Sequence, residues 1–434
     1  MEPLTTGWIF IGLLFILLFS RMPVAFVLII VGFGGYWLVS GWVPGLRILA
    51  IIPYDKVAVY TMSVLPLFIL MGELTYRGGF AEELFVAARN WLAWIPGGLV
   101  QATIAGAAAF GAACGSGLAS CAVVSRVTIP PMLKQGVERG MAFGAVAAAG
   151  TIAQMIPPSV LMVIYGVITE QSIGRLLIAG IIPGLVAAAN YMIMVFIRVK
   201  RNPSLSPPPV GVSWGKRTTS LLRVWPIALL SLIVMGGIYT GVFTPTEAGA
   251  LGAFSALVIG FATRRLKFDG LKDALFSSAK TASMIFLIIA CAFLFGYFLG
   301  ISRIPTIISD FLVGAEVPRM VVLIGILVFY VFLGMFLDMI AAMFLTLPII
   351  LPAMWALGFD PIWFGVIMVH MCEVALITPP FGLNLFVMKG IIPEAEFGEI
   401  VRGIVPFFVM DMVTLALYVA FPQLALWLPG LMWK

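Results

Sequence analysis

The chain has 434 residues, of which 62% are hydrophobic and 10% are charged. This composition excludes a water-soluble fold, because no soluble protein of this length could bury so much apolar surface. The 25 basic and 19 acidic residues give a net charge of +6. Since basic loops set the orientation of membrane proteins, this small excess does not indicate nucleic-acid binding. We therefore predict an all-α polytopic protein in a lipid bilayer, with room for about a dozen crossings.

Apolar stretches, taken in chain order, predict the membrane spans. The first two, 7–20 and 23–44, meet at Arg21-Met22-Pro23, which we expect to be a tight break. Met1-Glu2-Pro3 carries no basic region and no small-residue cleavage site follows it, so we expect no cleaved signal peptide. The other predicted spans are 92–113, 174–198, 224–242, 247–263, 282–300, 320–337 and 404–429.

Charged segments separate some of these spans. Three of them are too polar to span and are expected to lie at the membrane interface as amphipathic connectors: 79–91, 266–280 and 303–318. The loops 198–223 and 264–280 are rich in Lys and Arg. The positive-inside rule predicts that both are cytoplasmic, so the turn at 241–246 is expected on the outside.

The turn at 241–246 carries a helix-start signal. Thr244 is placed as an N-cap, Pro245 at the first helical position and Glu247 at the third. Together these residues match a capping box, in which the Thr and Glu side chains satisfy each other's backbone amides. We interpret Glu247 as the start of a helix, with a direct role in transport as the alternative.

Two proline pairs, Pro157-Pro158 and Pro379-Pro380, lie inside long apolar stretches. Proline removes an amide donor and clashes with the preceding turn, so each pair is expected to break its helix. The broken helices are predicted over 141–168 and 362–390. Helices broken at matching positions in two halves point to the binding site of a secondary transporter.

The surroundings of the proline pairs indicate two repeats. Pro130 precedes Pro157 by 27 residues, and Pro352 precedes Pro379 by the same 27. Downstream, the pattern Gly180-x-x-Pro183 recurs as Gly403-x-x-Pro406. We therefore predict an inverted-repeat transporter of the elevator type, with two broken helices and two re-entrant helical hairpins.

The hairpins are predicted just before the broken helices, at 114–131 and 334–352. Each segment is too short to cross the membrane twice and too apolar for a solvent loop. Irregular backbone at such a tip is tolerated where it is buried in protein or lines a cavity. Lys134 and Arg139 follow the first hairpin, which is expected to open to the cytoplasm, whereas 358–363 lacks basic residues, so the second is expected to enter from outside.

Each hairpin tip is expected to meet the broken helix of its own repeat. Unwound carbonyls and hydroxyl or carboxylate oxygens suit a small cation. For individual Gly and Ser residues, close helix packing is the alternative. The predicted sodium ligands are Gly115, Ser116, Gly117, Ser120, Pro157, Pro158 and Ser159 in the first repeat, and Asp338, Thr346, Thr378, Pro379 and Asn384 in the second.

Other polar groups in apolar surroundings are weaker candidates. Arg126, with its neighbour Ser125, could meet an anionic substrate, or Arg126 could extend to the interface. Glu373 could assist cation or proton binding, or hydrogen-bond a neighbour. His370, the only histidine, is interpreted as an interior polar group. The cysteines are interpreted as packing residues rather than redox or metal groups: Cys114, Cys121, Cys291 and Cys372.

These predictions divide the chain into consecutive regions. The boundaries are 1–91 for N-terminal scaffold helices and a connector, 92–200 for the transport region of repeat one, 201–280 for a cytoplasmic loop and scaffold helices, 281–319 for a connecting helix and interfacial arm, 320–402 for the transport region of repeat two, and 403–434 for a C-terminal helix.

Five motifs in this chain are distinctive: IPPS at 156–159, YGVITEQSIG at 165–174, FTPTEA at 243–248, GMFLD at 334–338 and TPPFGLNLF at 378–386. Together they resemble the motifs of one transporter family, the large (M, DctM-type) membrane subunit of tripartite ATP-independent periplasmic (TRAP) transporters. The resemblance covers nearly the whole length. The first hairpin departs from it, because Cys114 and Cys121 stand where many relatives have Ser, Thr or Ala.

The resemblance implies a mechanism and partners. A transport domain holding both hairpins would slide against a scaffold, coupled to sodium ions bound at the hairpin tips and helix breaks, and no other cofactor is expected. The partners would be a small four-helix membrane subunit and a soluble periplasmic protein that delivers an organic anion. The location would be the bacterial inner membrane.

Other functions fit the sequence less well. A stand-alone sodium or proton symporter for organic anions, with no binding protein, is the nearest alternative. An enzyme is not expected, because a metalloprotease would need His-Glu-x-x-His and no Gly-x-Ser-Gly marks a serine hydrolase. An ATP-driven pump is excluded by the lack of a Gly-x-x-x-x-Gly-Lys-[Ser/Thr] loop.

Overall fold

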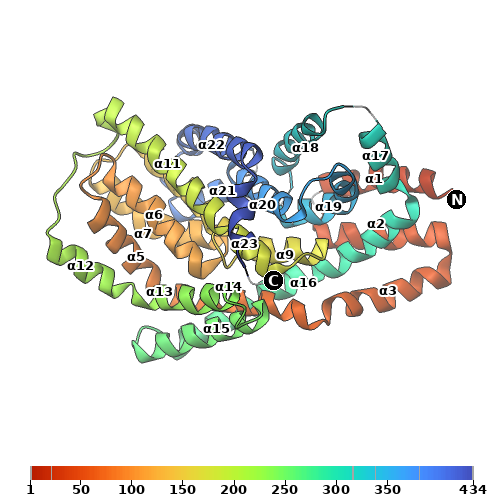
Figure 1. Ribbon diagram of the computed structural model, residues 1–434, viewed down its shortest axis with the longest axis horizontal. Helices are drawn as coiled ribbons and strands as arrows, with labels where there is room; N and C mark the ends of the chain where they lie inside the picture. The colour runs from red at the N-terminus through yellow and green to blue at the C-terminus, as the bar shows by residue number, and fades with distance from the viewer. Residues whose placement is uncertain (1, 21, 315–316, 338, 381, 433–434) are drawn as a thin grey trace.

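The computed structural model describes residues 2–20, 22–314, 317–337, 339–380 and 382–432, and within them the chain is helical, with no strand (Figure 1). The helices are α1 (Pro3–Phe19), α2 (Val24–Ser40), α3 (Trp42–Val57), α4 (Val64–Arg77), α5 (Phe80–Leu92), α6 (Gly98–Cys114), α7 (Gly117–Lys134), α8 (Arg139–Met155), α9 (Val160–Thr169), α10 (Ile173–Ala179), α11 (Ile181–Arg201), α12 (Trp214–Arg223), α13 (Trp225–Ser231), α14 (Gly237–Tyr239), α15 (Pro245–Ala262), α16 (Phe268–Ser302), α17 (Ile304–Gly314), α18 (Arg319–Gly334), α19 (Met339–Ala356), α20 (Pro361–Ile377), α21 (Leu383–Ile391), α22 (Phe397–Ala420) and α23 (Gln423–Gly430).

Among the described residues, four segments are single helices long and apolar enough to cross a bilayer, and three bent helix pairs would raise that number to seven. Fewer uninterrupted spans exist than the sequence predicted, because several apolar stretches are divided into helices of 10 to 17 residues. The predicted span 404–429 is instead shifted toward the N-terminus: α22 is a full-length span over Phe397–Ala420, and the short α23 follows a break at Phe421-Pro422.

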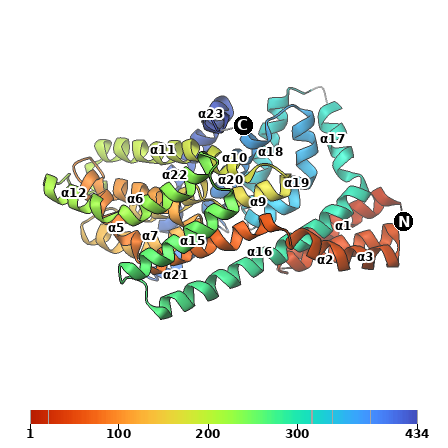
Figure 2. The ribbon, with the colours of Figure 1, turned by 60° about the horizontal axis from the view of Figure 1, so that its bottom comes forward.

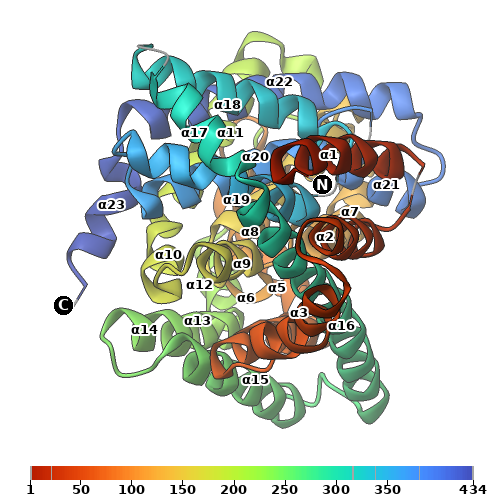
Figure 3. The ribbon, with the colours of Figure 1, turned by 90° about the vertical axis from the view of Figure 1, so that its right-hand side faces the viewer.

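One further prediction about the helices was wrong. Residues 266–280 do not form a separate connector, because α16 runs without interruption for 35 residues. The predicted region boundaries at 280 and 402 therefore fall inside continuous helices, α16 and α22. The sequence analysis also assigned no span to α3 and α4, whose packing against α16 (with α2 beside them) forms one side of the molecule (Figures 1 and 3).

Both hairpins exist, but their arms differ from the prediction. The predicted span 92–113 is the first arm of hairpin one: α6 and α7 join at Gly115-Ser116 and pack side by side. In the same way, the predicted span 320–337 is the first arm of hairpin two, formed by α18 and α19. The arms α6, α18 and α19 are as apolar as short membrane spans, so hydropathy alone could not distinguish these arms from spans.

Along the molecule's long axis, α6 and α7 lie toward one end, and α18 and α19 lie on the other side of the centre, beside α1 and α2 (Figures 1 and 2). The two arms of hairpin two also meet at their open end, where the Arg319 guanidinium at the start of α18 lies 5.5 Å from the centre of the Phe359 ring just beyond α19. The side of the membrane from which each hairpin enters stays a prediction.

Both predicted helix breaks are confirmed. The axes of α8 and α9 differ by 45° across the break at residues 156–159. In the second repeat, α20 ends at Ile377 and α21 begins at Leu383. The bond within each proline pair is cis. The proline pairs therefore divide one helix in each repeat, as the sequence predicted.

Helix α8 is the centre of the packing. Every residue from Gly140 to Met155 is buried, and a Cβ at Gly144 would collide with the Gly403 carbonyl of α22. Glycine here allows two helix backbones to touch, as in other membrane helix pairs. Residues of both repeats thus share one core around α8.

The capping box at the start of α15 is confirmed. The Glu247 carboxylate accepts from the Thr244 amide at 2.8 Å, and the Glu247 amide donates to the Thr244 hydroxyl at 3.3 Å. Thr244→Ala is expected to lower the stability of this helix start by about 1 kcal/mol, seen as a lower unfolding temperature in detergent. Thr244→Ser keeps the oxygen and is expected to match the wild type; an equal loss in both variants would contradict the capping role.

Candidate functional site

One cavity of about 510 Å³ is bordered by all four helix discontinuities. Ser116 precedes α7, Val160 begins α9, Ile340 lies at the start of α19 and Leu383 begins α21, and all four residues line the cavity. The opposite wall comes from α4 and α16. Four helix N-termini therefore converge on one space, and the positive ends of their dipoles favour a negatively charged group.

The tip of hairpin one touches the helix break of its own repeat. Gly115 has a φ of +64°, and a Cβ at this position would collide with the Pro158 carbonyl oxygen. The Val160 amide, at the start of α9, donates to the Gly115 carbonyl at 3.4 Å. This contact is the arrangement predicted for repeat one, and it needs glycine for both conformation and space.

Two predicted ligands at this junction cap helices. Ser116 accepts from the Ala119 amide at 3.4 Å and Ser159 accepts from the Met162 amide at 3.2 Å. These are N-cap hydrogen bonds, and they fix the start of α7 and of α9 on either side of Gly115. Gly117, Pro157 and Pro158 lie in the same junction.

Ser120 and Asn384 form a second group of candidate ligands. Both side chains are fully buried, and neither the Ser120 hydroxyl nor the Asn384 Oδ1 has a hydrogen-bond partner among the described residues. The Asn384 amide nitrogen donates to the Ala147 carbonyl at 3.0 Å, which aims Oδ1 away from α8. Buried oxygens without partners are costly unless a donor or a cation satisfies them.

This second group joins the two repeats. Cys121, beside Ser120 on α7, lies 3.6 Å from the Asn384 carbonyl oxygen on α21. The sequence predicted contacts of each hairpin tip with the broken helix of its own repeat, and this additional contact between the repeats was not predicted. No local pattern could have indicated it, because 263 residues separate its partners.

The other ligands predicted in repeat two are placed less favourably. The Thr346 hydroxyl donates to the Ala342 carbonyl at 2.7 Å and also contacts the Tyr330 hydroxyl, about two turns from the hairpin tip. The Thr378 hydroxyl donates to the Val374 carbonyl at 2.6 Å, and Pro379 follows it at the break. Asp338 lies outside the described residues.

None of the weak substrate candidates lines the cavity. Arg126 borders a neighbouring cavity, and its guanidinium is 3.4 Å from the hydroxyl of Tyr76, which does line the cavity. Ser125 is buried and donates to the Cys121 carbonyl at 2.7 Å. Glu373 is buried beside His370. Arg126 therefore reaches the cavity only through Tyr76.

The cavity wall contains one carboxylate that the sequence analysis missed. Glu73 of α4 lies 3.7 Å from Arg77 and accepts from the Ser277 hydroxyl of α16 at 2.9 Å. An ionisable residue within an apolar helix was the available signal. Arg77 also pairs with Asp273 at 3.1 Å, so one guanidinium is shared by two carboxylates and offsets only part of the negative charge that Glu73 places opposite the positive helix ends.

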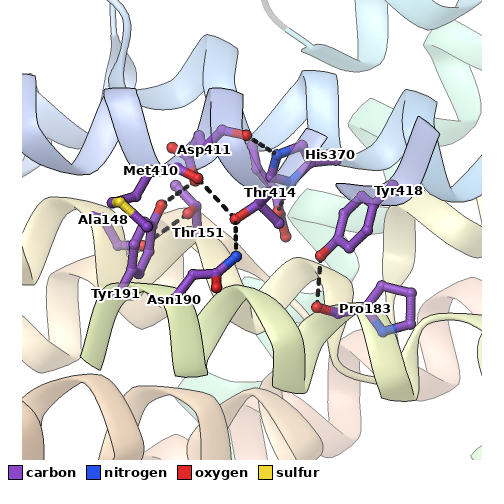
Figure 4. Close-up of polar contacts among 11 residues, drawn as sticks. Ala148, Thr151, Pro183, Asn190, Tyr191, His370, Met410, Asp411, Thr414 and Tyr418 are labelled. Atoms are coloured by element: carbon purple, nitrogen blue, oxygen red, sulfur yellow. Dashed lines mark hydrogen bonds and ion pairs between the residues drawn. The ribbon is translucent and has the colours of Figure 1, made fainter. Parts of the chain in front are cut away.

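A buried polar network lies behind the site (Figure 4). The Tyr191 hydroxyl of α11 donates to the Asp411 carboxylate of α22, and His370 of α20 contacts the Asp411 carbonyl through Nε2 at 3.0 Å. Because a carbonyl can only accept, Nε2 carries a hydrogen. Nδ1 lies 3.1 Å from Glu373, so that pair shares one further proton.

The network holds both repeats together. Asn190 of α11 donates to Thr414 of α22 at 2.9 Å, and the Tyr418 hydroxyl donates to the Pro183 carbonyl at 2.6 Å. Glu373 also approaches the backbone amide of Met155, just before the first helix break. His370 thus lies among interior polar contacts, as the sequence predicted. Glu373 contacts a neighbouring side chain, which was one of the two roles considered for it. Asp411 was missed, although it stands in an apolar span.

Removing one hydroxyl tests the network. Tyr191→Phe is expected to lower the free energy of unfolding by about 1–3 kcal/mol, because the buried Asp411 carboxylate loses its donor. Thermal unfolding in detergent measures the loss. Tyr297→Phe, at a partly exposed site on α16, is the matched control and is expected to leave the unfolding temperature unchanged. Equal unfolding temperatures for both variants would show that the network adds no stability.

The chain matches the profile of one protein family over residues 11–424, described as the DctM component of the tripartite ATP-independent periplasmic transporter. Relatives include the C4-dicarboxylate TRAP transporter large permease protein DctM of Pseudomonas aeruginosa, at 35% identity over 88% of this chain and 90% of that protein. The sialic acid TRAP transporter large permease protein SiaM of Vibrio cholerae is 32% identical, with 96% of each chain covered.

A third relative is longer than this chain. The isethionate TRAP transporter permease protein DctMQ of Oleidesulfovibrio alaskensis is 33% identical over 87% of this chain, and the match spans 60% of its length.

Solved structures of similar fold are also transporters. The YdaH transporter of Alcanivorax borkumensis has a TM-score of 0.57 at 15% identity, with 89% of both chains covered. Neisseria gonorrhoeae MtrF has a TM-score of 0.59 at 15% identity, covering 86% of this chain and 84% of that chain. At this identity the likeness establishes the fold alone.

Proposed function

Because the chain belongs to the DctM family, the large permease component of TRAP transporters, we propose that it imports a small organic anion together with sodium ions. The family is a transporter component and not a family of enzymes. The observation that carries the proposal is the convergence of four helix N-termini on one cavity of about 510 Å³. Helix N-termini can stabilise the carboxylate of a substrate even where no basic side chain lines the cavity.

Sodium is proposed at the sites behind this cavity. Helices α6 and α8 end at the junction, so their last carbonyls are available there, and the Ser120 and Asn384 oxygens lack partners among the described residues. Hard oxygen ligands of this kind suit a small cation. Each net positive charge moved inward gains about 2.3 kcal/mol per 100 mV of membrane potential, which would drive accumulation of the anion.

The proposed cycle is an elevator in the bacterial inner membrane, with loops 198–223 and 264–280 in the cytoplasm. The hairpins and broken helices would move as one body, held together by the network around Asp411, against the scaffold of α2, α3, α4 and α16. A small four-helix subunit and a periplasmic binding protein would be separate chains. The relatives are named for substrates as different as C4-dicarboxylates and sialic acid, so we propose only the class of organic acids.

Thermal unfolding tests the ion dependence without knowledge of the substrate. The purified chain is heated in detergent with sodium, potassium or choline chloride at matched ionic strength. A bound ion stabilises the folded state by about 2.7 kcal/mol when its concentration is a hundred times its Kd, so a sodium-specific rise is expected. Identical unfolding in the three salts would contradict sodium coupling and favour a proton-coupled carrier.

Reconstituted uptake tests the partners. Proteoliposomes that contain the chain and a small subunit are given a sodium gradient and labelled C4-dicarboxylate or sialic acid, with and without a matching binding protein. We expect uptake only when the binding protein is present. Uptake by the chain alone would instead support the stand-alone symporter.

A further inference from the structure

A second cavity, of about 640 Å³, lies away from the transport site. It is enclosed by the end of α5, the start of α6, the start of α12 and the segment 206–213 that leads into α12. Its polar lining consists of Arg89, Asn90, Gln135, Ser206, Ser213 and Lys216. Two of these side chains are cations, and none of the described residues that line the cavity carries a carboxylate.

Two helix N-termini open into this cavity. Gly98 and Leu99 are the first residues of the 17-residue α6, and Ser213 directly precedes the 10-residue α12. Neither helix start has a side-chain cap, so the first amides of both remain available. Amides at helix starts, together with Arg and Lys, form an anion site suited to phosphate oxygens.

A buried hydroxyl gives a separate indication of a ligand. Ser206 lines the cavity and is only 6% exposed, and its Oγ has no hydrogen-bond partner among the described residues. Its position is fixed by the backbone, because the adjacent Leu205 carbonyl accepts from the Glu138 amide at 3.0 Å and the Val210 amide donates to the Ala93 carbonyl at 2.8 Å. These two bonds hold the main chain around Ser206 beside the cavity, and its hydroxyl is left without a partner for a ligand to supply.

The surroundings resemble a membrane interface. Trp91 and Trp214 are exposed, pack edge to face, and flank the cavity, with the Arg217 guanidinium 5.0 Å from the Trp214 ring. Exposed tryptophans gather at the level of lipid headgroups. Leu221 and Leu222, further along α12, are also exposed, which provides an apolar surface beside the cavity for acyl chains.

We propose that this cavity binds the phosphate of an anionic phospholipid headgroup. Arg89 and Lys216 provide the charge, the starts of α6 and α12 provide backbone donors, and Ser206 provides a buried hydroxyl. Helix α6 is an arm of hairpin one, whereas α5 and α12 flank that arm. A lipid bound in this cavity would therefore contact hairpin one and the two helices beside it. The proposal goes beyond the transport function and requires neither sodium nor substrate.

Binding is tested with soluble short-chain lipids and the purified full chain at constant salt. Dioctanoyl phosphatidylglycerol is expected to raise the unfolding temperature in a saturable manner, whereas dioctanoyl phosphatidylcholine is not. Arg89→Ala combined with Lys216→Ala is expected to weaken binding, so that the half-saturating lipid concentration rises about tenfold or more. Both side chains are exposed, so the variant is expected to fold, and size-exclusion chromatography checks this. Lys200→Ala, a basic residue outside the cavity, is the matched control and is expected to bind as the wild type does.

Three outcomes would overturn the proposal. Equal stabilisation by the choline lipid would show that headgroup charge is irrelevant. An unchanged affinity in the double variant would place the lipid elsewhere. The same shift with inorganic phosphate alone would make the cavity a small-anion site and not a lipid site. Native mass spectrometry of the retained phosphatidylglycerol provides a readout that does not depend on thermal stability. Because no arm measures transport or sodium binding, failure here leaves the proposed function untouched.

Discussion

Asn384→Ala is expected to abolish the sodium-specific rise in unfolding temperature and sodium-driven uptake. Asn384 is fully buried, its Nδ2 is held by the Ala147 carbonyl, and its Oδ1 has no partner in the described part of the chain. Alanine removes the oxygen that would bind the ion. At saturating sodium the expected loss is the whole ion contribution, about 2.7 kcal/mol at a hundredfold excess over Kd.

Two variants separate an ion ligand from a packing residue. Asn384→Asp keeps an oxygen for the ion but loses the donor to the Ala147 carbonyl, so it is expected to retain a weakened, still sodium-specific response. Asn190→Ala removes a comparable amide from the buried network, bonded to Thr414, and is expected to lower the unfolding temperature equally in all salts. If Asn384→Ala kept its full sodium response, Asn384 would be a structural residue and the site assignment would fail.

Gly403→Ala is expected to have the largest effect on stability. Its new Cβ would collide with the Gly140 carbonyl oxygen at the start of α8. Neither backbone can yield as a flexible side chain would, so α8 and α22 must separate. Overpacking usually costs about 1–3 kcal/mol and occasionally more, and we expect the upper end or a failure to recover folded protein.

Gly398→Ala is the matched control for this prediction. It lies on the same helix, α22, and no atom lies within 4 Å of a Cβ at that position. Alanine there is expected to be neutral or slightly stabilising, because it has the better helix propensity. Thermal unfolding and the yield of monodisperse protein compare the two variants. Equal stability would mean that α8 and α22 can move apart at little cost.

The helix breaks were predictable from sequence because proline acts locally. Pro157-Pro158 and Pro379-Pro380 remove amide donors wherever they stand, so their effect requires no tertiary information. The Thr244 capping box is local in the same sense. The elements were less predictable where hydropathy was the only signal: α6 and α18 are as apolar as membrane spans but are arms of hairpins.

Contacts between repeats could not be predicted from the sequence. The meeting of Cys121 with Asn384, and of Gly144 with Gly403, depends on which helices pack together. The positions of Arg126 and Glu373 show the same limit, since both were chosen by residue type and neither lines the cavity where the four helix N-termini meet. Glu73 and Asp411 could have been found, because carboxylates in apolar stretches are rare enough to be examined individually.

The burial of α8 has a consequence for how this protein could evolve. Every residue from Gly140 to Met155 is buried, and a Cβ at Gly144 or Gly150 would collide with the neighbouring helix at Gly403 or Cys121, so enlargement at these positions disturbs the packing. We therefore expect inherited variation to be sparse along α8. We expect changes of substrate to arise instead from substitutions in the α4 and α16 wall of the 510 Å³ cavity, such as at Ile69, Tyr76 and Met284. There the size and polarity of a side chain can change without moving a helix.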